Sequence, residues 1–161
     1  MDKWDARFLR IASEVSSWSK DPGTRVGAVL VCARRIIATG YNGFPANISD
    51  KTDRYLNRET KLKLTVHAEV NAIINAAKSG ASTQGSTLYV TFSPCIHCAI
   101  AVIQSGVCRI VCPTIESAPE RWRDNFVEGA QVLREAGISI TYFDPDVFRK
   151  ECALYYERRV P

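Results

Sequence analysis

The chain has 161 residues, of which 46% are hydrophobic and 24% charged, a composition typical of a soluble globular protein. Because this length suits one domain with its own core, we expect a single domain over residues 1–161. The formal net charge of +4 suits an anionic small-molecule ligand, but the basic residues are scattered, so nucleic acid is not an expected partner. No stretch has the length of a membrane span or the pattern of a signal peptide, so we expect a cytoplasmic protein without a membrane partner.

The first third of the chain predicts a helix followed by a hairpin. Apolar residues recur at helical spacing over residues 3–19, and Asp21-Pro22-Gly23 ends this helix. Two strand-like runs, residues 25–32 and 35–39, are joined at Ala33-Arg34.

Beyond the hairpin, a turn and a polar segment precede alternating helices and strands. The turn is Gly40-Tyr41-Asn42-Gly43, and the polar segment covers residues 46–65, with a short helical piece around residues 55–62. The expected helices cover residues 67–79, 95–104 and 120–136. Pro94 is expected at the first position of the second of these helices. A last helix starts at residue 144, and its apolar members are Val147, Phe148, Leu154 and Tyr155. The expected strands cover residues 87–92, 109–112 and 138–143.

The connection between the last two strands indicates the fold class. These strands are joined by a helix rather than a tight turn, so they can lie parallel. We therefore expect an α/β fold with a single mixed five-stranded sheet sandwiched by helices and with the last two strands parallel.

The residues that carry chemistry lie in His67-Ala68-Glu69 and in Pro94-Cys95-Ile96-His97-Cys98. One histidine and two cysteines are three zinc ligands, and a catalytic zinc leaves its fourth position to water. H-x-E followed by P-C-x-x-C is the signature of the zinc nucleobase deaminases. Residues two apart on a helix do not share a face, so His67 and Glu69 serve one metal only if it lies off the helix N-terminus. The N-termini of both helices would then favour the thiolates.

In this interpretation zinc lowers the pKa of a bound water, and Glu69 moves that water's proton to the base and then to the departing amine. Alternative interpretations are a structural zinc, which calls for a fourth cysteine or histidine, and a redox cysteine pair. His97 is the only other histidine, and its position between the two cysteines predicts a side chain that points away from the metal. Cys32, Cys108, Cys112 and Cys152 are expected to be small buried hydrophobic residues.

Four segments make the chain resemble a zinc-dependent deoxycytidylate (dCMP) deaminase of the compact bacterial and phage type, within the cytidine/deoxycytidylate deaminase superfamily. They begin at Asp21, Gly40, His67 and Ser93, and they read DPGTRVGA, GYNGFP, HAEVNAI and SPCIHCA. The resemblance runs from Trp4 to about Phe143 and implies a cytidine deaminase-like fold.

The resemblance implies hydrolysis of dCMP to dUMP and ammonia by one zinc per chain. Zinc would be held by His67, Cys95 and Cys98, and Glu69 would shuttle protons. Substrate-binding residues would be Arg25 at the phosphate, Asn42 at the sugar, and Ala68 and Ser93 at the base edge. The family also implies a homohexamer activated by dCTP, with Mg²⁺ as a possible companion of that effector, and inhibited by dTTP. The allosteric residues would be Gly40, Tyr41, Asn42 and Gly43.

Other substrates stay open at this point: free cytidine, dCTP or the wobble adenosine of tRNA. A tRNA enzyme should show a clustered basic surface, and a small cytidine deaminase usually has a cysteine in place of His67. A zinc-stabilised binding module without activity is the alternative from another class, and it has no use for Glu69.

Overall fold

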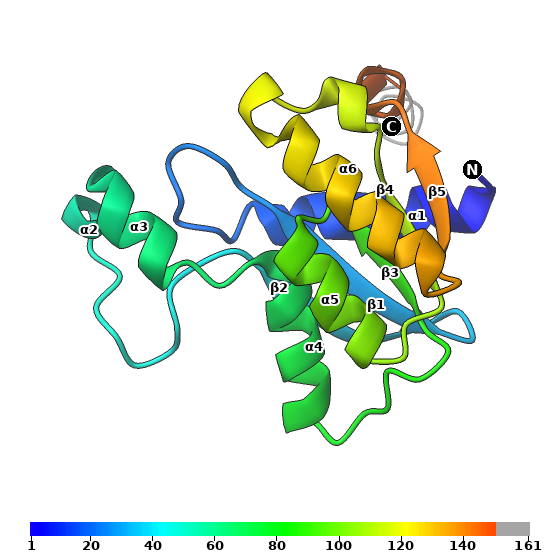
Figure 1. Ribbon diagram of the computed structural model, residues 1–161. Coiled ribbons are helices and arrows are strands. Elements are labelled where there is room, and N and C mark those ends of the chain that lie inside the picture. The colour runs from blue at the N-terminus through cyan, green and yellow to red at the C-terminus, as the bar shows by residue number, and fades with distance from the viewer. Residues whose placement is uncertain (151–161) are drawn as a thin grey trace, which may run out of the picture.

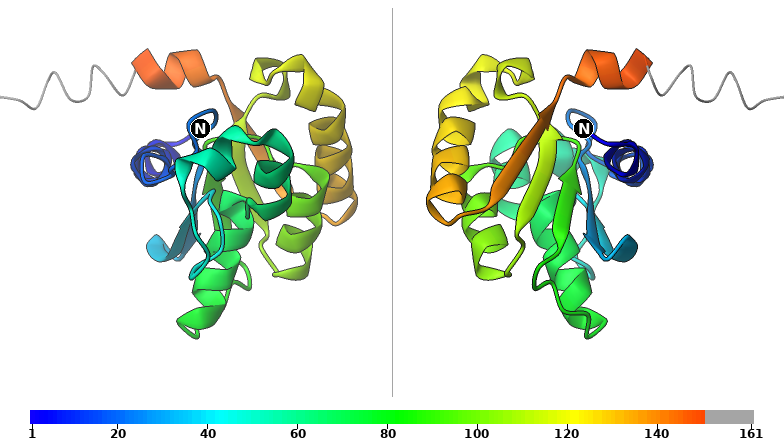
Figure 2. Two further views of the ribbon diagram at one scale, coloured as in Figure 1. Left: turned by 90° about the vertical axis from the view of Figure 1, so that its left-hand side faces the viewer. Right: turned by 90° about the vertical axis from the view of Figure 1, so that its right-hand side faces the viewer.

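The computed structural model describes residues 1–150, which form one five-stranded sheet with helices on both faces (Figures 1 and 2). The strands are β1 (Gly27–Cys32), β2 (Arg35–Tyr41), β3 (Thr87–Val90), β4 (Arg109–Pro113) and β5 (Ser139–Phe143). Their order across the sheet is β2-β1-β3-β4-β5. β1 is antiparallel to β2 and β3, whereas β3, β4 and β5 run parallel. The predicted mixed sheet with its last two strands parallel is confirmed.

The hairpin turn and the length of β2 depend on local backbone geometry. Ala33 and Arg34 have φ values of 48° and 63°, the left-handed pair that a two-residue turn needs between twisted strands. The predicted hinge is therefore confirmed. β2 continues to Tyr41, two residues beyond the predicted strand, so Gly40 and Tyr41 belong to the sheet rather than to a turn.

The helices differ from the predicted ones mainly at their ends, except that the short helical piece predicted around residues 55–62 is two helices that meet at Asn57. The helices are α1 (Lys3–Ser16), α2 (Thr52–Leu56), α3 (Arg58–Leu64), α4 (Ala68–Lys78), α5 (Ile96–Gln104) and α6 (Glu120–Glu135), with a short 3-10 turn η1 (Ile115–Ser117). α1 ends before residue 19, where the hydroxyls of Ser16 and Ser17 donate back to carbonyls of the last turn. Residues 145–150 are helical, as expected for the last helix, whereas Cys152, Leu154 and Tyr155 lie outside the described residues. No helix within residues 1–150 is long and apolar enough to cross a membrane.

Alternating side chains of the central strands divide the core into two layers. On β1, Ala28 and Leu30 face α4 and α5, whereas Val29 and Val31 face α1. The views in Figure 2 show α1 on one face of the sheet and α4, α5 and α6 on the other. α2 and α3 stand apart from both layers at one end of the sheet (Figure 1).

A glycine of β2 brings α4 unusually close to the sheet. A Cβ atom at Gly40 would lie 2.3 Å from the backbone nitrogen of Ala72 and 2.4 Å from the carbonyl oxygen of Ala68. Only glycine fits at this position, because the helix backbone occupies the space of a side chain. Gly40 thus fixes where the N-terminal half of α4 lies.

Two predictions about individual residues are wrong. Pro94 precedes α5 instead of occupying its first position, because Cys95 is the N-cap and the helix begins at Ile96. Of the cysteines within residues 1–150 that were expected to be buried, Cys112 is buried, whereas Cys32 is half-buried and Cys108 is exposed. Cys108 lies just before β4, between the turn at Gly106 and the sheet, where the strand pattern no longer dictates burial.

Candidate active site

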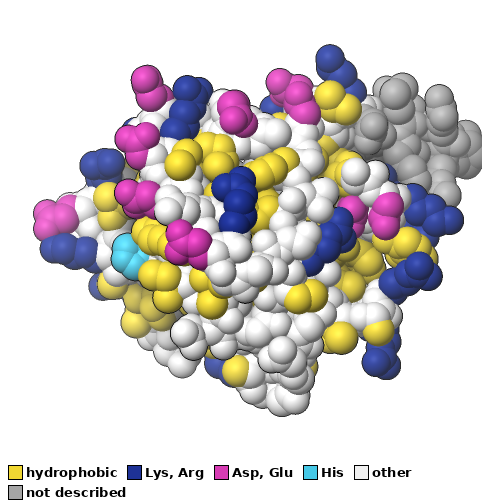
Figure 3. Space-filling model, turned by 45° about the vertical axis from the view of Figure 1, so that its right-hand side comes forward, with side chains coloured by type: hydrophobic (Ala, Val, Ile, Leu, Met, Phe, Trp, Pro, Cys, Tyr) yellow, Lys and Arg dark blue, Asp and Glu magenta, His cyan; other side chains and the backbone are white. Residues whose placement is uncertain are grey.

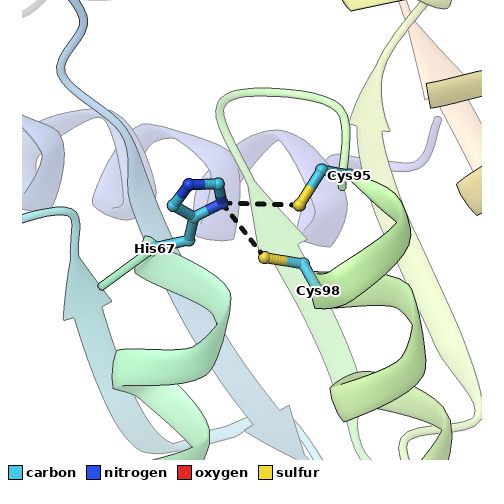
Figure 4. Close-up of side chains that lie close together, drawn as sticks. All are labelled: His67, Cys95 and Cys98. Atoms are coloured by element: carbon cyan, nitrogen blue, oxygen red, sulfur yellow. Dashed lines mark hydrogen bonds between the residues drawn. The ribbon is translucent and has the colours of Figure 1, made fainter. Parts of the chain in front are cut away.

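His67, Cys95 and Cys98 lie together between the N-termini of α4 and α5 (Figure 4). The Nδ1 atom of His67 is 3.5 Å from Sγ of Cys95 and 3.3 Å from Sγ of Cys98. Tetrahedral zinc with ordinary Zn–S and Zn–N bonds would hold such atoms about 3.6 Å apart. The three side chains therefore fit a zinc ion, as the sequence predicts.

Helix ends place these ligands. His67 is the N-cap of α4 and Cys95 the N-cap of α5, and neither side chain makes a capping hydrogen bond in its own helix. Cys98 lies in the first turn of α5, so its sulfur faces the same region as that of Cys95. Both helix N-termini direct their partial positive charge at this region, which favours thiolates there.

The two cysteines have opposite protonation tendencies because they share a proton. A hydrogen bond from Cys98 and another from His67 lower the pKa of Cys95 to about 4, although burial opposes the shift. The proton that Cys98 donates to Cys95, together with burial, raises the pKa of Cys98. The hydrogen bond with Cys95 also raises the pKa of His67. These shifts favour the thiolate form of Cys95, and a metal that displaces the proton of Cys98 would form the second thiolate.

Glu69 lies in the first turn of α4 and is 3% exposed. Burial raises the pKa of its carboxyl group to about 7, because the charged form loses hydration. Such a value lets a carboxyl group both accept and donate a proton near neutral pH. Its position beside the three ligands is the one that the H-x-E spacing predicts.

A cavity of about 260 Å³ opens at this site. His67, Ala68, Glu69, Ser93 and Cys95 form its inner wall. Ala68 is fully buried, and the hydroxyl of Ser93 donates to the carbonyl of Pro113, so the backbone of both residues is held firmly. The structure thus brings the predicted base-edge residues together with the metal ligands.

The opposite side of the cavity, which we call the outer wall, is formed by six residues of the segment 52–65. Its lining residues come from α2, α3 and the link to α4: Tyr55, Leu56, Arg58, Lys61, Leu62 and Thr65. Lys61 pairs with Asp21 at 2.7 Å, and the ring of Tyr55 stacks on Phe44 at 4.1 Å. These two contacts tie the outer wall to the loops around the hairpin.

Asn42 lines the cavity, and its side chain also braces the neighbouring loop. Its Oδ1 accepts from the backbone N–H of Val26 at 2.7 Å, and its Nδ2 donates to the carbonyl of Thr24 at 2.9 Å. Asn42 is 5% exposed. It is therefore a fixed part of the wall, and its predicted contact with a sugar stays a prediction.

The remaining predicted residues lie around the cavity rather than in it. Arg25 is exposed, and the cavity is lined by its neighbours Thr24 and Val26 but not by Arg25 itself. Tyr41 is exposed and lies edge-on to Trp18. The close approach that Gly40 permits is to the backbone of α4, and its allosteric role stays a prediction.

Several cavity residues were missed by sequence analysis. α6 supplies Arg121, Trp122 and Phe126, with Phe126 edge-on to Phe92 at 5.3 Å. Trp122 and Phe126 are four residues apart, so helical spacing could have shown that they share a face, although not what that face meets. His97 is exposed, as expected from its place between the cysteines.

Comparisons with known proteins agree with this geometry. The profile of the family described as "Cytidine and deoxycytidylate deaminase zinc-binding region" matches residues 2–114. The chain is 37% identical to an uncharacterized deaminase of Aliivibrio fischeri, over 92% of this chain and 99% of that protein. It is 36% identical to the deoxycytidylate deaminase of Enterobacteria phage T4, over 82% of this chain and 86% of that protein.

A solved structure supports the same relationship. The dCMP deaminase of cyanophage S-TIM5, crystallised with dCMP and dUMP, superposes with a TM-score of 0.72 at 28% identity, covering 89% of this chain and 99% of that one. The profile match spans α1 to β4 and includes every predicted metal ligand. On these grounds the chain belongs to the cytidine and deoxycytidylate deaminase family, whose members are zinc-binding deaminases.

Proposed function

We propose that this enzyme hydrolyses dCMP to dUMP and ammonia. The observation that carries the proposal is the joint placement of the His67, Cys95 and Cys98 cluster and the buried Glu69 on one wall of a nucleotide-sized cavity. The relatives named deoxycytidylate deaminase, and the cyanophage enzyme crystallised with dCMP and dUMP, support this substrate. The face shown in Figure 3 has basic and acidic side chains interspersed, which gives no support to a tRNA substrate.

The catalytic residue in this proposal is Glu69. One zinc ion per chain, bound by His67, Cys95 and Cys98, would supply a water of lowered pKa, so that hydroxide is available near neutral pH. Glu69 would take a proton from the attacking water and deliver it to N3 of the cytosine as the water oxygen bonds to C4. It would then take the proton that this oxygen still carries and pass it to the amine, whose bond to C4 breaks to release ammonia. The pKa of about 7 that burial gives this carboxyl group suits both transfers.

The base and the phosphate would be held by different walls. The backbone of Ala68 and Ser93 reads the base edge, and Phe92, Phe126 and Trp122 enclose it with apolar surface. Arg58 and Arg121 line the cavity, and within residues 1–150 neither forms an ion pair, so both are available to a phosphate. They are better placed for it than Arg25, although Arg25 stays a candidate.

An ammonia-release assay with cytidine, deoxycytidine, dCMP and dCTP tests the substrate. We expect dCMP to be converted far more efficiently than deoxycytidine, because a phosphate paired with arginine contributes charge-assisted hydrogen bonds. Arg58→Ala and Arg121→Ala should raise KM for dCMP and leave deoxycytidine unaffected, with Arg25→Ala as the third arm. Equal turnover of deoxycytidine and dCMP would exclude recognition of the phosphate.

Regulation is the second part of the proposal: a homohexamer activated by dCTP, with Mg²⁺ as its counterion, and inhibited by dTTP. The support is the location of Tyr41 and Asn42, since the first is exposed and the second is a buried part of the cavity wall. A ligand that displaces this segment would move Asn42 and the loop that it braces.

Velocity curves and mass measurement test this regulation. Velocity against dCMP concentration should be sigmoidal alone, hyperbolic with dCTP and Mg²⁺, and depressed by dTTP. Light scattering should give six times the chain mass. Identical curves with millimolar dCTP and dTTP would refute the regulatory claim and leave the catalytic one intact.

A further inference from the structure

The N-terminus of α5 lacks the cap that such a helix ordinarily has. The first N–H groups of a helix need acceptors from outside its own hydrogen-bond ladder, and a serine, aspartate or asparagine at the N-cap usually supplies one. Here the N-cap is Cys95, whose side chain makes no capping hydrogen bond. Its sulfur is directed at His67 instead.

A residue of another helix accepts a hydrogen bond from one of these first N–H groups. The side-chain oxygen Oδ1 of Asn125, on α6, accepts from the backbone N–H of Ile96 at 3.0 Å. This N–H belongs to the peptide group that joins Cys95 to Ile96. Asn125, 29 residues beyond Ile96 in the chain, therefore holds the peptide group that carries a metal ligand.

The same face of α6 has a second contact with this peptide. A Cβ atom at Gly129 would lie 2.9 Å from the carbonyl oxygen of Pro94 and 3.2 Å from the carbonyl carbon of Cys95. Gly129 is four residues after Asn125, so both face the metal loop. Glycine here lets the α6 backbone rest directly on the loop that carries Cys95.

We propose that Asn125 and Gly129 are positioning residues of the metal centre, which hold Cys95 at ligand distance from His67. Neither residue touches the metal site. α6 lies beyond residue 114, where the family match ends, so this role is not assigned by that match. The inference rests on the zinc site of the proposed function but not on the identity of its substrate.

The test measures zinc retention without substrate. Zinc-loaded wild type, Asn125→Leu and Asn125→Asp are mixed with excess chromogenic chelator, and the rate of zinc transfer is recorded. Asn125→Leu removes the acceptor at nearly constant volume, and we expect zinc loss to be about 10- to 100-fold faster, the usual effect of losing an outer-shell partner. Asn125→Asp keeps an acceptor at the same place and should restore retention.

Asn57→Leu is a matched control. Oδ1 of Asn57 also accepts a backbone N–H at a helix start, that of Thr60 at 2.9 Å, but on α3. Its loss should leave zinc transfer unchanged. The cobalt-substituted proteins give a second readout, because the sulfur-to-cobalt absorption bands report thiolate geometry. These bands should shift in Asn125→Leu and not in Asn125→Asp or Asn57→Leu.

Zinc transfer from Gly129→Ala is a second test of the proposal, which does not depend on whether Asn125→Leu folds. Alanine favours a helix over glycine, so a general effect on α6 would be stabilising. If Gly129→Ala loses zinc faster although its helix is stabilised, the cause is the added methyl group, which presses on the loop that carries Cys95. Wild-type zinc transfer in Asn125→Leu or in Gly129→Ala, or equally fast loss in Asn125→Leu and Asn125→Asp, would overturn the proposal. A protein that retains zinc as expected but does not convert dCMP would contradict the proposed function alone.

Discussion

The two walls of the cavity are built in different ways. The inner wall belongs to the ends of α4 and α5, which pack on the sheet, and Ala68, Glu69 and Ser93 are each at most 5% exposed. The outer wall stands at one end of the sheet, and two of its apolar side chains, Leu56 and Leu62, are 73% and 51% exposed. The inner wall is therefore fixed by burial, and the outer wall by a few specific contacts.

This difference indicates a division of roles. Catalysis needs the reacting side chains to be held within a fraction of an ångström of their productive positions, and packing in a buried core provides this precision. Substrate entry and release need a wall that can move, and segments with few buried apolar contacts open at the lowest free-energy cost. Substitutions in the inner wall should therefore change turnover, and those in the outer wall should change KM.

The largest effect is expected from the metal ligands. Cys98→Ser should lose the metal and all measurable activity, because serine is a poor zinc ligand and only two ligands remain. Cys108→Ser, at the exposed cysteine outside the site, should keep both. Metal analysis of the two purified variants checks this. A zinc-free wild type, or one with two zincs per chain, would contradict the assigned centre.

The next effect is expected from Glu69, on the same wall. Glu69→Gln keeps the shape of the side chain but cannot carry a proton, so kcat should fall about 10²- to 10⁴-fold. Zinc content and dCMP binding should stay at wild-type levels. Turnover above a tenth of the wild-type value would show that another group carries the proton.

Sequence reasoning was most successful for the inner wall. The H-x-E and P-C-x-x-C spacings predict helix N-termini that share a metal, and the two N-caps are His67 and Cys95. The strand pattern and the helical connections likewise predict the mixed sheet. Both results follow from local rules, because spacing along a helix or strand determines which side chains share a face.

The outer wall and α6 could not be predicted in the same way. Lys61 meets Asp21 forty residues away in the chain, and Asn125 meets Ile96 across two helices. Neither pair has a periodic signal, since each depends on how separate elements dock. Gly40 illustrates the same limit: the sequence pattern predicted a turn, whereas the structure shows a strand on which a helix packs closely.

A moderate effect is expected from the contact that holds the outer wall. Lys61→Met removes the partner of the buried Asp21, and a hydrogen bond between charged groups contributes about 1.5–3 kcal/mol. We expect KM to rise roughly 10-fold or more for dCMP, and also for any residual deoxycytidine activity, with kcat nearly unchanged. Substitution of a phosphate-binding arginine should instead affect dCMP alone.

Lys63 provides the matched control for this change. It lies two residues further along α3 and pairs with Glu59 at 2.6 Å, but both side chains are more than 70% exposed. Exposed pairs of this kind contribute little, so Lys63→Met should leave KM within about twofold. Equal effects of the two substitutions would show that general loss of positive charge, rather than the Asp21 contact, weakens substrate binding.

The smallest effect on catalysis, with a clear effect on stability, is expected on the far side of the sheet. Asp5 of α1 accepts two hydrogen bonds from Arg109 of β4, both of 2.8 Å, and one from the hydroxyl of Tyr89. Burial alone would raise the pKa of Asp5, but the bonds from Arg109, the backbone of Asp2 and Tyr89 lower it below its ordinary value. The pair joins α1 to the sheet, behind the core and away from both cavity walls.

Because the pKa of Asp5 is lowered in the folded state, the unfolded chain binds this proton more readily. The stabilisation is therefore fully present above the ordinary aspartate pKa of about 4 and is lost as the pH falls below it, toward the folded pKa. Asp5→Asn lacks this titration, so the stability difference between wild type and variant should be large at pH 7 and shrink between about pH 4 and pH 2. Urea unfolding of both proteins across this range measures the difference, and zinc release in acid largely cancels because both proteins have the same ligands. Since the pair lies outside the cavity, KM and kcat at pH 7 and 25 °C should be unchanged. A stability difference between wild type and variant that is constant with pH would show that Asp5 contributes through packing rather than charge.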